Sequence, residues 1–369
     1  MRRLFANFFL SAARSTVAPA SVTAAPQPLS TRLDFLDGLR GVAALAVFLA
    51  HAGHKASPAF RTYLEPYFNV GSWGVVLFFL CSGFILPVSL ERQGSLGRFW
   101  IRRFFRLYPL YWVNVAIMAM IGPGEPRMVL SGPPAQSIRI FLANLTMFQA
   151  FMGFPHLMAL YWTLTLELLF YILLSLLFLL KLNMRISSAT LALIVLSICA
   201  ELVIPLPFAF SYSTHLILIL VGLVAYRHYS GALRPAVGVA VLLLTPLMLV
   251  IPLLVDPRDS QQQLPWVVAQ MAACACFGAA YLLRAWPVHP FLRHLGRISY
   301  SIYLMHTIVL DSIPQMSTPL LTLLVWLVLL LLLASATYQW IERPMIAWGQ
   351  RLTRPADREA SRAMPAQPD

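Results

Sequence analysis

Long apolar runs separated by short polar connections dominate the chain. Within these runs the apolar residues are continuous and do not alternate with polar ones, which is typical of transmembrane helices and not of barrel strands. Several runs are shorter than the ~20 residues of an upright span, so tilt or local thinning of the bilayer is expected. The predicted fold class is therefore all-α, a polytopic membrane protein with about ten transmembrane helices. The predicted spans are 38–57, 70–89, 107–122, 158–181, 189–206, 212–227, 235–255, 264–284, 298–315 and 318–341.

One apolar stretch is excluded from this set. Residues 137–153 are interrupted by Arg139, Asn144 and Gln149. We interpret the stretch as a re-entrant or interfacial piece of a long loop, because a further span there would reverse the orientation of everything after it.

The distribution of positive charge predicts that both termini are cytoplasmic. With ten spans, the outside loops carry five of the 27 Lys and Arg residues and the inside segments carry the other 22. Such an excess on the cytoplasmic side is the usual determinant of orientation. The predicted location is the cell inner (plasma) membrane, crossed several times.

Composition agrees with an almost wholly embedded chain. Only 11% of the residues are charged and 59% are hydrophobic, whereas soluble domains carry about 25% charged residues. The net charge of +13 follows from the orientation rule, so we expect no nucleic acid partner. The four Cys lie in apolar runs and are predicted to be small buried hydrophobes, with no metal site.

Three segments are expected. Residues 33–350 form the membrane domain, and 351–369 form a disordered cytoplasmic tail. Residues 1–32 have no acid, and their apolar patch is short for a signal peptide. A transit peptide would fit their composition, but we favour a disordered cytoplasmic tail.

The stretch Leu36–His54 carries the first candidate chemistry. Arg40 and His51 are eleven residues apart, about three helical turns or 16 Å, so they share one face of the first span. Ionisable groups at membrane depth usually face a protein interior or a wet cavity. Histidine also suits proton abstraction from a hydroxyl. We interpret this face as one wall of an active site, the alternative being a snorkelling arginine and a hydrogen-bonded core histidine.

Three arginines begin the third span. Arg102, Arg103 and Arg106 are spaced for one side of a helix. Guanidinium groups bind phosphate oxygens in pairs, yet the same cluster would also bind anionic lipid headgroups. The residues alone favour neither interpretation.

Two further spans hold polar groups. Glu167 has Thr163 and Tyr171 four residues away on either side. A buried carboxyl needs a partner, so it either makes a structural hydrogen bond or orients His51 or an acceptor hydroxyl. His306 follows Tyr303 by three residues and is either a second polar wall or, as we slightly favour, a satisfied core histidine.

These stretches occur together and in this order along the chain, and the combination resembles the acyltransferase-3 family of bacterial membrane O-acyltransferases. The matching features are Arg40-x10-His51, LFFxxSGF at 77–84, RRxxRLxPxY at 102–111, WTLxxExxFY at 162–171, ISYSIYLxH at 298–306 and IERP at 341–344.

The resemblance implies transfer of an acyl group, commonly acetyl, from acyl-CoA to a hydroxyl of an envelope or extracellular polysaccharide. It implies that Arg40 and His51 are essential, and that Arg102, Arg103 and Arg106 handle the CoA end, to which we add Arg40 as a further expected contact. On this basis His51 and Glu167 are the expected catalytic residues. The expected substrate contacts are Trp162, Tyr303 and His306. The expected partners are the acyl-CoA donor, a glycan acceptor and the bilayer, with no permanently bound cofactor.

A polytopic transporter or exporter of a glycan or lipid-linked intermediate is the alternative function. Transporters usually show internal repeats between halves. Here the polar motifs are concentrated before residue 171 and do not recur, which favours the enzyme.

Overall fold

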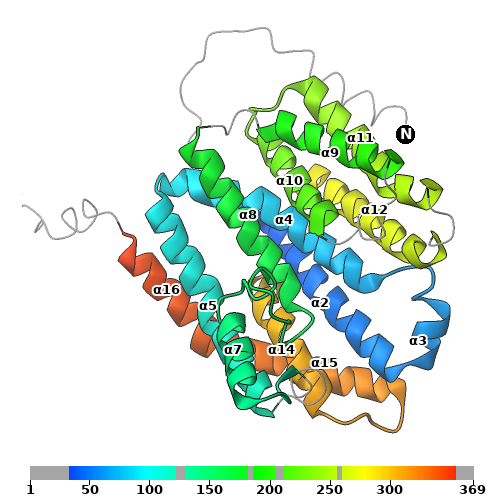
Figure 1. Ribbon diagram of the computed structural model, residues 1–369, viewed down its shortest axis with the longest axis vertical. Helices are drawn as coiled ribbons and strands as arrows, with labels where there is room; N and C mark the ends of the chain where they lie inside the picture. The colour runs from blue at the N-terminus through cyan, green and yellow to red at the C-terminus, as the bar shows by residue number, and fades with distance from the viewer. Residues whose placement is uncertain (1–32, 122–128, 182–185, 204–211, 256–259, 355–369) are drawn as a thin grey trace, which may run out of the picture.

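The computed structural model describes residues 33–121, 129–181, 186–203, 212–255 and 260–354, and these are helical with connecting turns (Figure 1). Most of residues 1–32 and 351–369, which we predicted to be disordered, lie outside the described residues. The helices are α2 (Asp34–Ala56), α3 (Pro58–Tyr63), α4 (Val70–Gln93), α5 (Leu96–Ile121), α7 (Pro134–Asn144), α8 (Tyr161–Leu179), α9 (Ile186–Val203), α10 (Tyr212–Tyr229), α11 (Pro235–Val255), α12 (Ser260–Leu282), α13 (Pro290–Arg297), α14 (Ser299–Ser312), α15 (Pro319–Thr337), η1 (Tyr338–Glu342) and α16 (Arg343–Leu352).

The described residues confirm the all-helical fold class, and each of the ten predicted spans overlaps a helix, although not all of these helices are long enough to cross a membrane. Within the described ranges, six helical segments are long and apolar enough to cross a membrane. They are 34–56, 70–93, 161–179, 235–254, 262–282 and 319–352. The stretch predicted to be re-entrant begins with α7, which at 11 residues is too short to span.

Local sequence signals explain where several helices begin and end. The Asn69 side chain accepts a hydrogen bond from the Ser72 amide at 2.8 Å and caps the start of α4. Gly94 ends α4 in the left-handed conformation, at φ 59°. Thr318 and Pro319 begin α15, as a capping residue followed by proline at the first helical position.

Helix α4 lies at the centre of the bundle, where it packs against α2, α10 and α12. Helix α2 also packs against α13 and α14, while α16 runs along α5 (Figure 1). The outer helices α11 and α15 expose leucines such as Leu242 and Leu332, as expected where a helix faces lipid. The prediction that all four cysteines are buried holds for Cys81, but Cys274 and Cys276 are half-buried and Cys199 on α9 is exposed, so for Cys199 it was wrong.

Two glycines set the close approach of α4 to α10. A Cβ added at Gly83 would lie 1.8 Å from the Ile219 carbonyl oxygen, and one added at Gly222 would lie 2.2 Å from the Leu80 carbonyl oxygen. Both obstacles are backbone atoms, which cannot rotate away. The glycines therefore allow the close helix packing that small residues give in membrane bundles.

Replacing Gly83 with Ala should lower the stability of the bundle by about 1–3 kcal/mol, because the added methyl forces α4 and α10 apart. Thermal unfolding in detergent measures the effect. The matched control is Gly278→Ala on α12, where an added Cβ meets nothing within 4 Å and the change should be neutral or slightly stabilising. Equal unfolding temperatures for the two variants would contradict the packing account.

Candidate active site

Helix α2 connects two chemically different ends of the bundle. Arg40 lies in its second turn, half-buried, and His51 lies in its last third with an exposed side chain. Their separation of eleven residues puts them on one face, about 16 Å apart along the axis. We call the end that holds Arg40 the arginine end and the end that holds His51 the histidine end.

At the arginine end, a cavity of about 480 Å³ lies between α4, α5 and the end of α16. Four guanidinium groups line it, and the other lining residues include no acid. The lining residues are Ile85, Val88, Ser89, Arg92, Gln93, Arg98, Arg102, Arg103 and Thr353. Such a lining is suited to a compact polyanion.

Two of the predicted arginines are held at this cavity by hydrogen bonds. Arg102 Nε donates to Thr353 Oγ1 at 2.7 Å, and Arg103 Nη2 donates to Ser89 Oγ at 2.8 Å. The Arg103 guanidinium also lies over the rings of Phe99 and Tyr171, at 5.6 and 6.0 Å from their centroids. These contacts fix both side chains before any ligand binds.

Arg106 separates from its two neighbours. It is absent from the cavity lining and lies instead within electrostatic range of Arg40. Arg92 and Arg98 take its place, and our sequence interpretation had not assigned them to the site. Both are close in sequence to the predicted cluster. The geometry of the turn between α4 and α5 decides which side chains meet there, and that geometry could not be predicted from the spacing.

Carboxylates balance the charge of Arg40 and Arg106, the two site arginines outside the cavity lining. Glu167, Asp37 and Glu342 all lie within electrostatic range of Arg106. Glu167 Oε1 accepts a hydrogen bond from the Tyr171 hydroxyl at 2.6 Å. These neighbours favour charge balance at the arginine end as the role of Glu167, whereas its predicted role in orienting His51 stays a prediction.

Glu342 belongs to the IERP motif and was not among our predicted site residues. It is 1% exposed, and its Oε2 accepts a hydrogen bond from Ser301 Oγ at 2.9 Å. It ends the π-helical turn between α15 and α16, and such turns are frequent at functional sites. An acid beside an apolar run of this length was the signal that could have identified it.

At the histidine end, two imidazole rings are stacked. The His51 and His306 rings lie 5.2 Å apart at an interplanar angle of 26°. His306 is fully buried, and its Nδ1 is 2.6 Å from the Tyr303 carbonyl oxygen. Because a carbonyl can only accept, Nδ1 carries the hydrogen. Nδ1 of His306 is thus paired, as expected of a core histidine, whereas the described residues offer no hydrogen-bond partner to Nε2.

Tyr303 lies close to this stack, whereas Trp162 packs against a different histidine. The Tyr303 hydroxyl is 2.6 Å from Thr163 Oγ1, and its ring lies 5.9 Å from that of His306. The Trp162 ring packs edge-on against His215, at 5.1 Å. His215, buried on α10, was missed by the sequence analysis because a lone histidine in an apolar run carries no spacing signal.

Comparison with known proteins identifies the architecture. Residues 33–340 match the family model for the acyltransferase domain of acyltransferase family 3. The chain belongs to the acyltransferase-3 family. The match covers all the helices that form the arginine and histidine ends except α16 and the last residues of η1.

Three curated proteins are similar over parts of the chain. Acyltransferase MdmB of Streptomyces mycarofaciens is 41% identical over 97 residues, covering 26% of this chain and 25% of MdmB. Nodulation protein 10 of Rhizobium leguminosarum bv. viciae is 29% identical over 164 residues, covering 38% and 43%. Protein 2 in the picA locus of Rhizobium radiobacter is 40% identical over 95 residues, covering 24% and 44%. The chain thus matches less than half the length of each relative. No solved structure matches it significantly.

Proposed function

We propose that this acyltransferase moves an acyl group, acetyl in the simplest case, from acyl-CoA to a hydroxyl of a cell-envelope or extracellular polysaccharide. The observation that carries the proposal is the chemical difference between the two ends of α2. A cavity with four guanidinium groups lies at one end of the bundle, and an exposed histidine stacked on a second histidine lies at the other.

The donor's phosphates belong at the arginine end. CoA carries a diphosphate and a further phosphate, and the cavity lining offers Arg92, Arg98, Arg102 and Arg103 without a competing acid. Arginine forks bind phosphate oxygens in pairs. A concave lining favours a compact polyanion over the flat headgroup layer of a membrane, so we prefer this assignment to lipid anchoring.

The pantetheine arm would follow the face of α2 from Arg40 to His51. At His51 the acceptor oxygen attacks the thioester carbonyl carbon, the new C–O bond forms and the C–S bond breaks. The imidazole takes the hydroxyl proton and passes it to the departing thiolate. Prior acylation of His51 itself reaches the same products by two displacements, with the same bonds made and broken overall.

The remaining site residues act around this step. Glu167 balances the charge of Arg40, Arg103 and Arg106, all within its electrostatic range. We assign the walls of the substrate passage to Trp162, Tyr303 and His306. Membership of an acyltransferase family favours this enzyme over the transporter alternative.

The orientation of the chain in the membrane determines the direction in which the acyl group is transferred. The excess of Lys and Arg in one set of loops favours an orientation with the arginine end in the cytoplasm, where acyl-CoA is found. The histidine end then faces outward, so an acceptor reaches His51 without crossing the membrane. We assign the chain to the inner membrane on this basis.

The test is transfer of radiolabelled acetyl from acetyl-CoA in membranes that carry the chain, compared with matched membranes that lack it. We expect label in de-O-acylated envelope glycan only when the chain is present, together with a mass increment of about 42 Da per acetyl group. Equal labelling in both samples would contradict the proposed function.

A further inference from the structure

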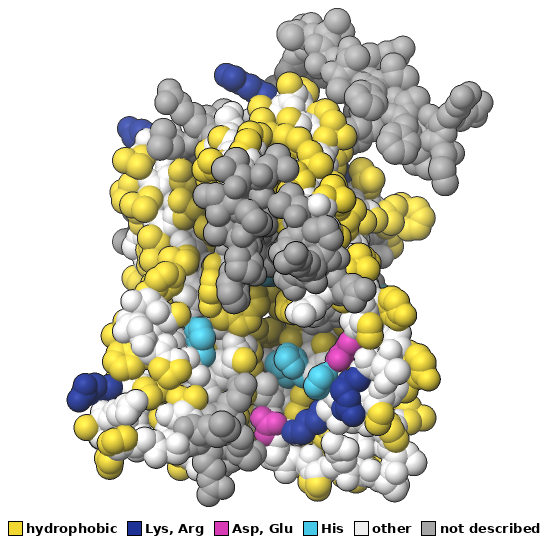
Figure 2. All heavy atoms as spheres, turned by 45° about the vertical axis from the view of Figure 1, so that its right-hand side comes forward, with side chains coloured by type: hydrophobic (Ala, Val, Ile, Leu, Met, Phe, Trp, Pro, Cys, Tyr) yellow, Lys and Arg dark blue, Asp and Glu magenta, His cyan; other side chains and the backbone are white. Residues whose placement is uncertain are grey.

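Charged side chains of both signs surround a hollow at the histidine end. Figure 2 shows histidine, basic and acidic side chains gathered around this hollow in the lower half of the face. Polar contacts link five residues that follow His51 at this end, and we call these residues the rim: His54, Lys55, Arg61, Glu65 and Asp311.

The rim is continuous with the stacked histidines. His54 and Lys55 follow His51 by three and four residues, so they lie on the same side of α2. Lys55 Nζ donates to Asp311 Oδ1 at 2.9 Å and to the Leu310 carbonyl oxygen at 2.5 Å. These bonds join the end of α2 to the end of α14, the helix that carries His306.

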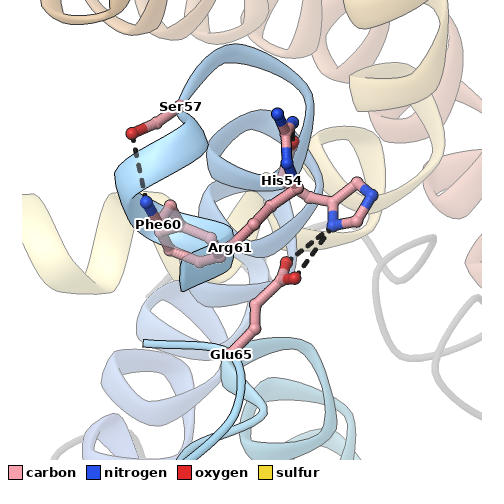
Figure 3. Close-up of polar contacts among 5 residues, drawn as sticks. All are labelled: His54, Ser57, Phe60, Arg61 and Glu65. Carbon is pink, nitrogen blue, oxygen red and sulfur yellow. Dashed lines mark hydrogen bonds and ion pairs between the residues drawn. The ribbon is translucent and has the colours of Figure 1, made fainter. Parts of the chain in front are cut away.

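The other half of the rim is held by the turn after α3 (Figure 3). His54 Nδ1 lies 2.8 and 3.0 Å from the two carboxylate oxygens of Glu65. Arg61 Nη1 donates to the His54 carbonyl oxygen at 2.5 Å, and the Phe60 ring fills the space beside Gly53. The rim is therefore a fixed arrangement built from three segments of the chain.

Charges in the rim compensate one another. Lys55 and Arg61 are matched by Glu65 and Asp311, whereas the lining of the cavity at the arginine end has four guanidinium groups and no acid. The side chains stay accessible, with 32% of Glu65 and 29% of Asp311 exposed. Each carboxylate has about four lone-pair sites, so both keep acceptor capacity after pairing. Because its charges compensate one another, such a rim does not attract an ion of either sign, but its polar groups can form hydrogen bonds with hydroxyl groups.

A second observation points to a ligand with hydroxyl donors. Nε2 of His306 has a lone pair, because Nδ1 carries the hydrogen that is donated to Tyr303. This atom is buried beside His51, and the described residues offer it no donor. A buried acceptor without a donor is costly. A hydroxyl group that displaces the His51 ring slightly from the stack would supply the missing hydrogen bond.

We infer that the rim is the acceptor subsite and that it takes an uncharged polyhydroxyl group, a neutral sugar residue, with Glu65 and Asp311 accepting hydrogen bonds from its hydroxyls. This inference rests on the proposed function and adds to it the charge class of the acceptor and the residues that bind it.

The test uses labelled acetyl-CoA and de-O-acylated envelope glycan, with the labelled glycan hydrolysed to monosaccharides under conditions that spare esters. We expect the label on a neutral monosaccharide. Glu65→Gln and Asp311→Asn should each raise the KM for the glycan about tenfold, since each weakens a hydrogen bond to a charged group. The KM for acetyl-CoA should stay within twofold, which a general loss of structure would not allow.

The matched control is Asp34→Asn, which removes a comparable ion pair, with Arg293 at 3.0 Å, at the arginine end of the same helix. It should leave the KM for the glycan unchanged. Label on an acidic or amino sugar, or an unchanged KM for the glycan in both rim variants, would overturn the subsite while the proposed function stands. Failure of the unmodified chain to label any glycan would instead defeat the proposed function and the subsite with it.

Discussion

Replacing His51 with Ala should lower kcat for acyl transfer by about 10²–10⁴-fold, the usual contribution of a general base. The KM for acyl-CoA should stay close to that of the unmodified enzyme, because the proposed phosphate contacts lie some three helical turns away at the arginine end. Initial rates of label transfer from acetyl-CoA, measured at saturating donor, give kcat directly.

The control for this variant is His228→Gln. His228 is a histidine of the same protein whose Nδ1 pairs with the Tyr281 hydroxyl at 2.7 Å, outside both ends of the site. Its replacement should leave kcat within about twofold. A His51→Ala enzyme with near-normal kcat would remove the imidazole from the mechanism and leave the His51–His306 stack as a packing feature.

The double variant Arg102→Gln with Arg103→Gln should raise the KM for acyl-CoA by two orders of magnitude or more. Hydrogen bonds to charged groups contribute about 1.5–3 kcal/mol each, or about tenfold or more for each arginine. Glutamine can still bond to Thr353 and Ser89, the present partners of these arginines, so the bundle should keep its stability. Saturation curves for acetyl-CoA measure the change, and kcat at saturation should fall little.

An exposed arginine provides the matched control. Arg234, exposed between α10 and α11, is absent from the cavity lining, and Arg234→Gln should leave the KM for acyl-CoA unchanged. Arg103→Lys should recover only part of the affinity, because lysine lacks the paired donors of the guanidinium group. Unchanged saturation in the double variant would favour lipid anchoring as the role of these arginines.

The helices were predictable because burial in lipid leaves few options. A continuous apolar run in a bilayer must satisfy its own backbone hydrogen bonds, and the described part of each of the ten runs contains a helix. The helix ends were harder to predict. α5 begins at Leu96, eleven residues before the predicted start of the third span, because polar residues continue the helix beyond the apolar run. Of these, Arg103 bonds to Ser89 on α4 and Arg102 bonds to Thr353, the residue after α16.

The candidate site was predictable where it lies on one helix. The shared face of Arg40 and His51 follows from helical geometry alone. The stacking of His306 on His51 and the approach of Glu342 to Arg106 join segments more than 200 residues apart. Local spacing contains no information about which helices meet, so these contacts required the structure.

The most direct test of the account is a sidedness assay in proteoliposomes that hold the chain in one orientation. Labelled acetyl-CoA is confined to the side of the arginine end, and the de-O-acylated glycan to the side of the histidine end. The account predicts that label appears on the glycan, at a rate that falls to background in His51→Ala. Transfer only when donor and glycan share one side would contradict the division of α2 into a donor end and an acceptor end.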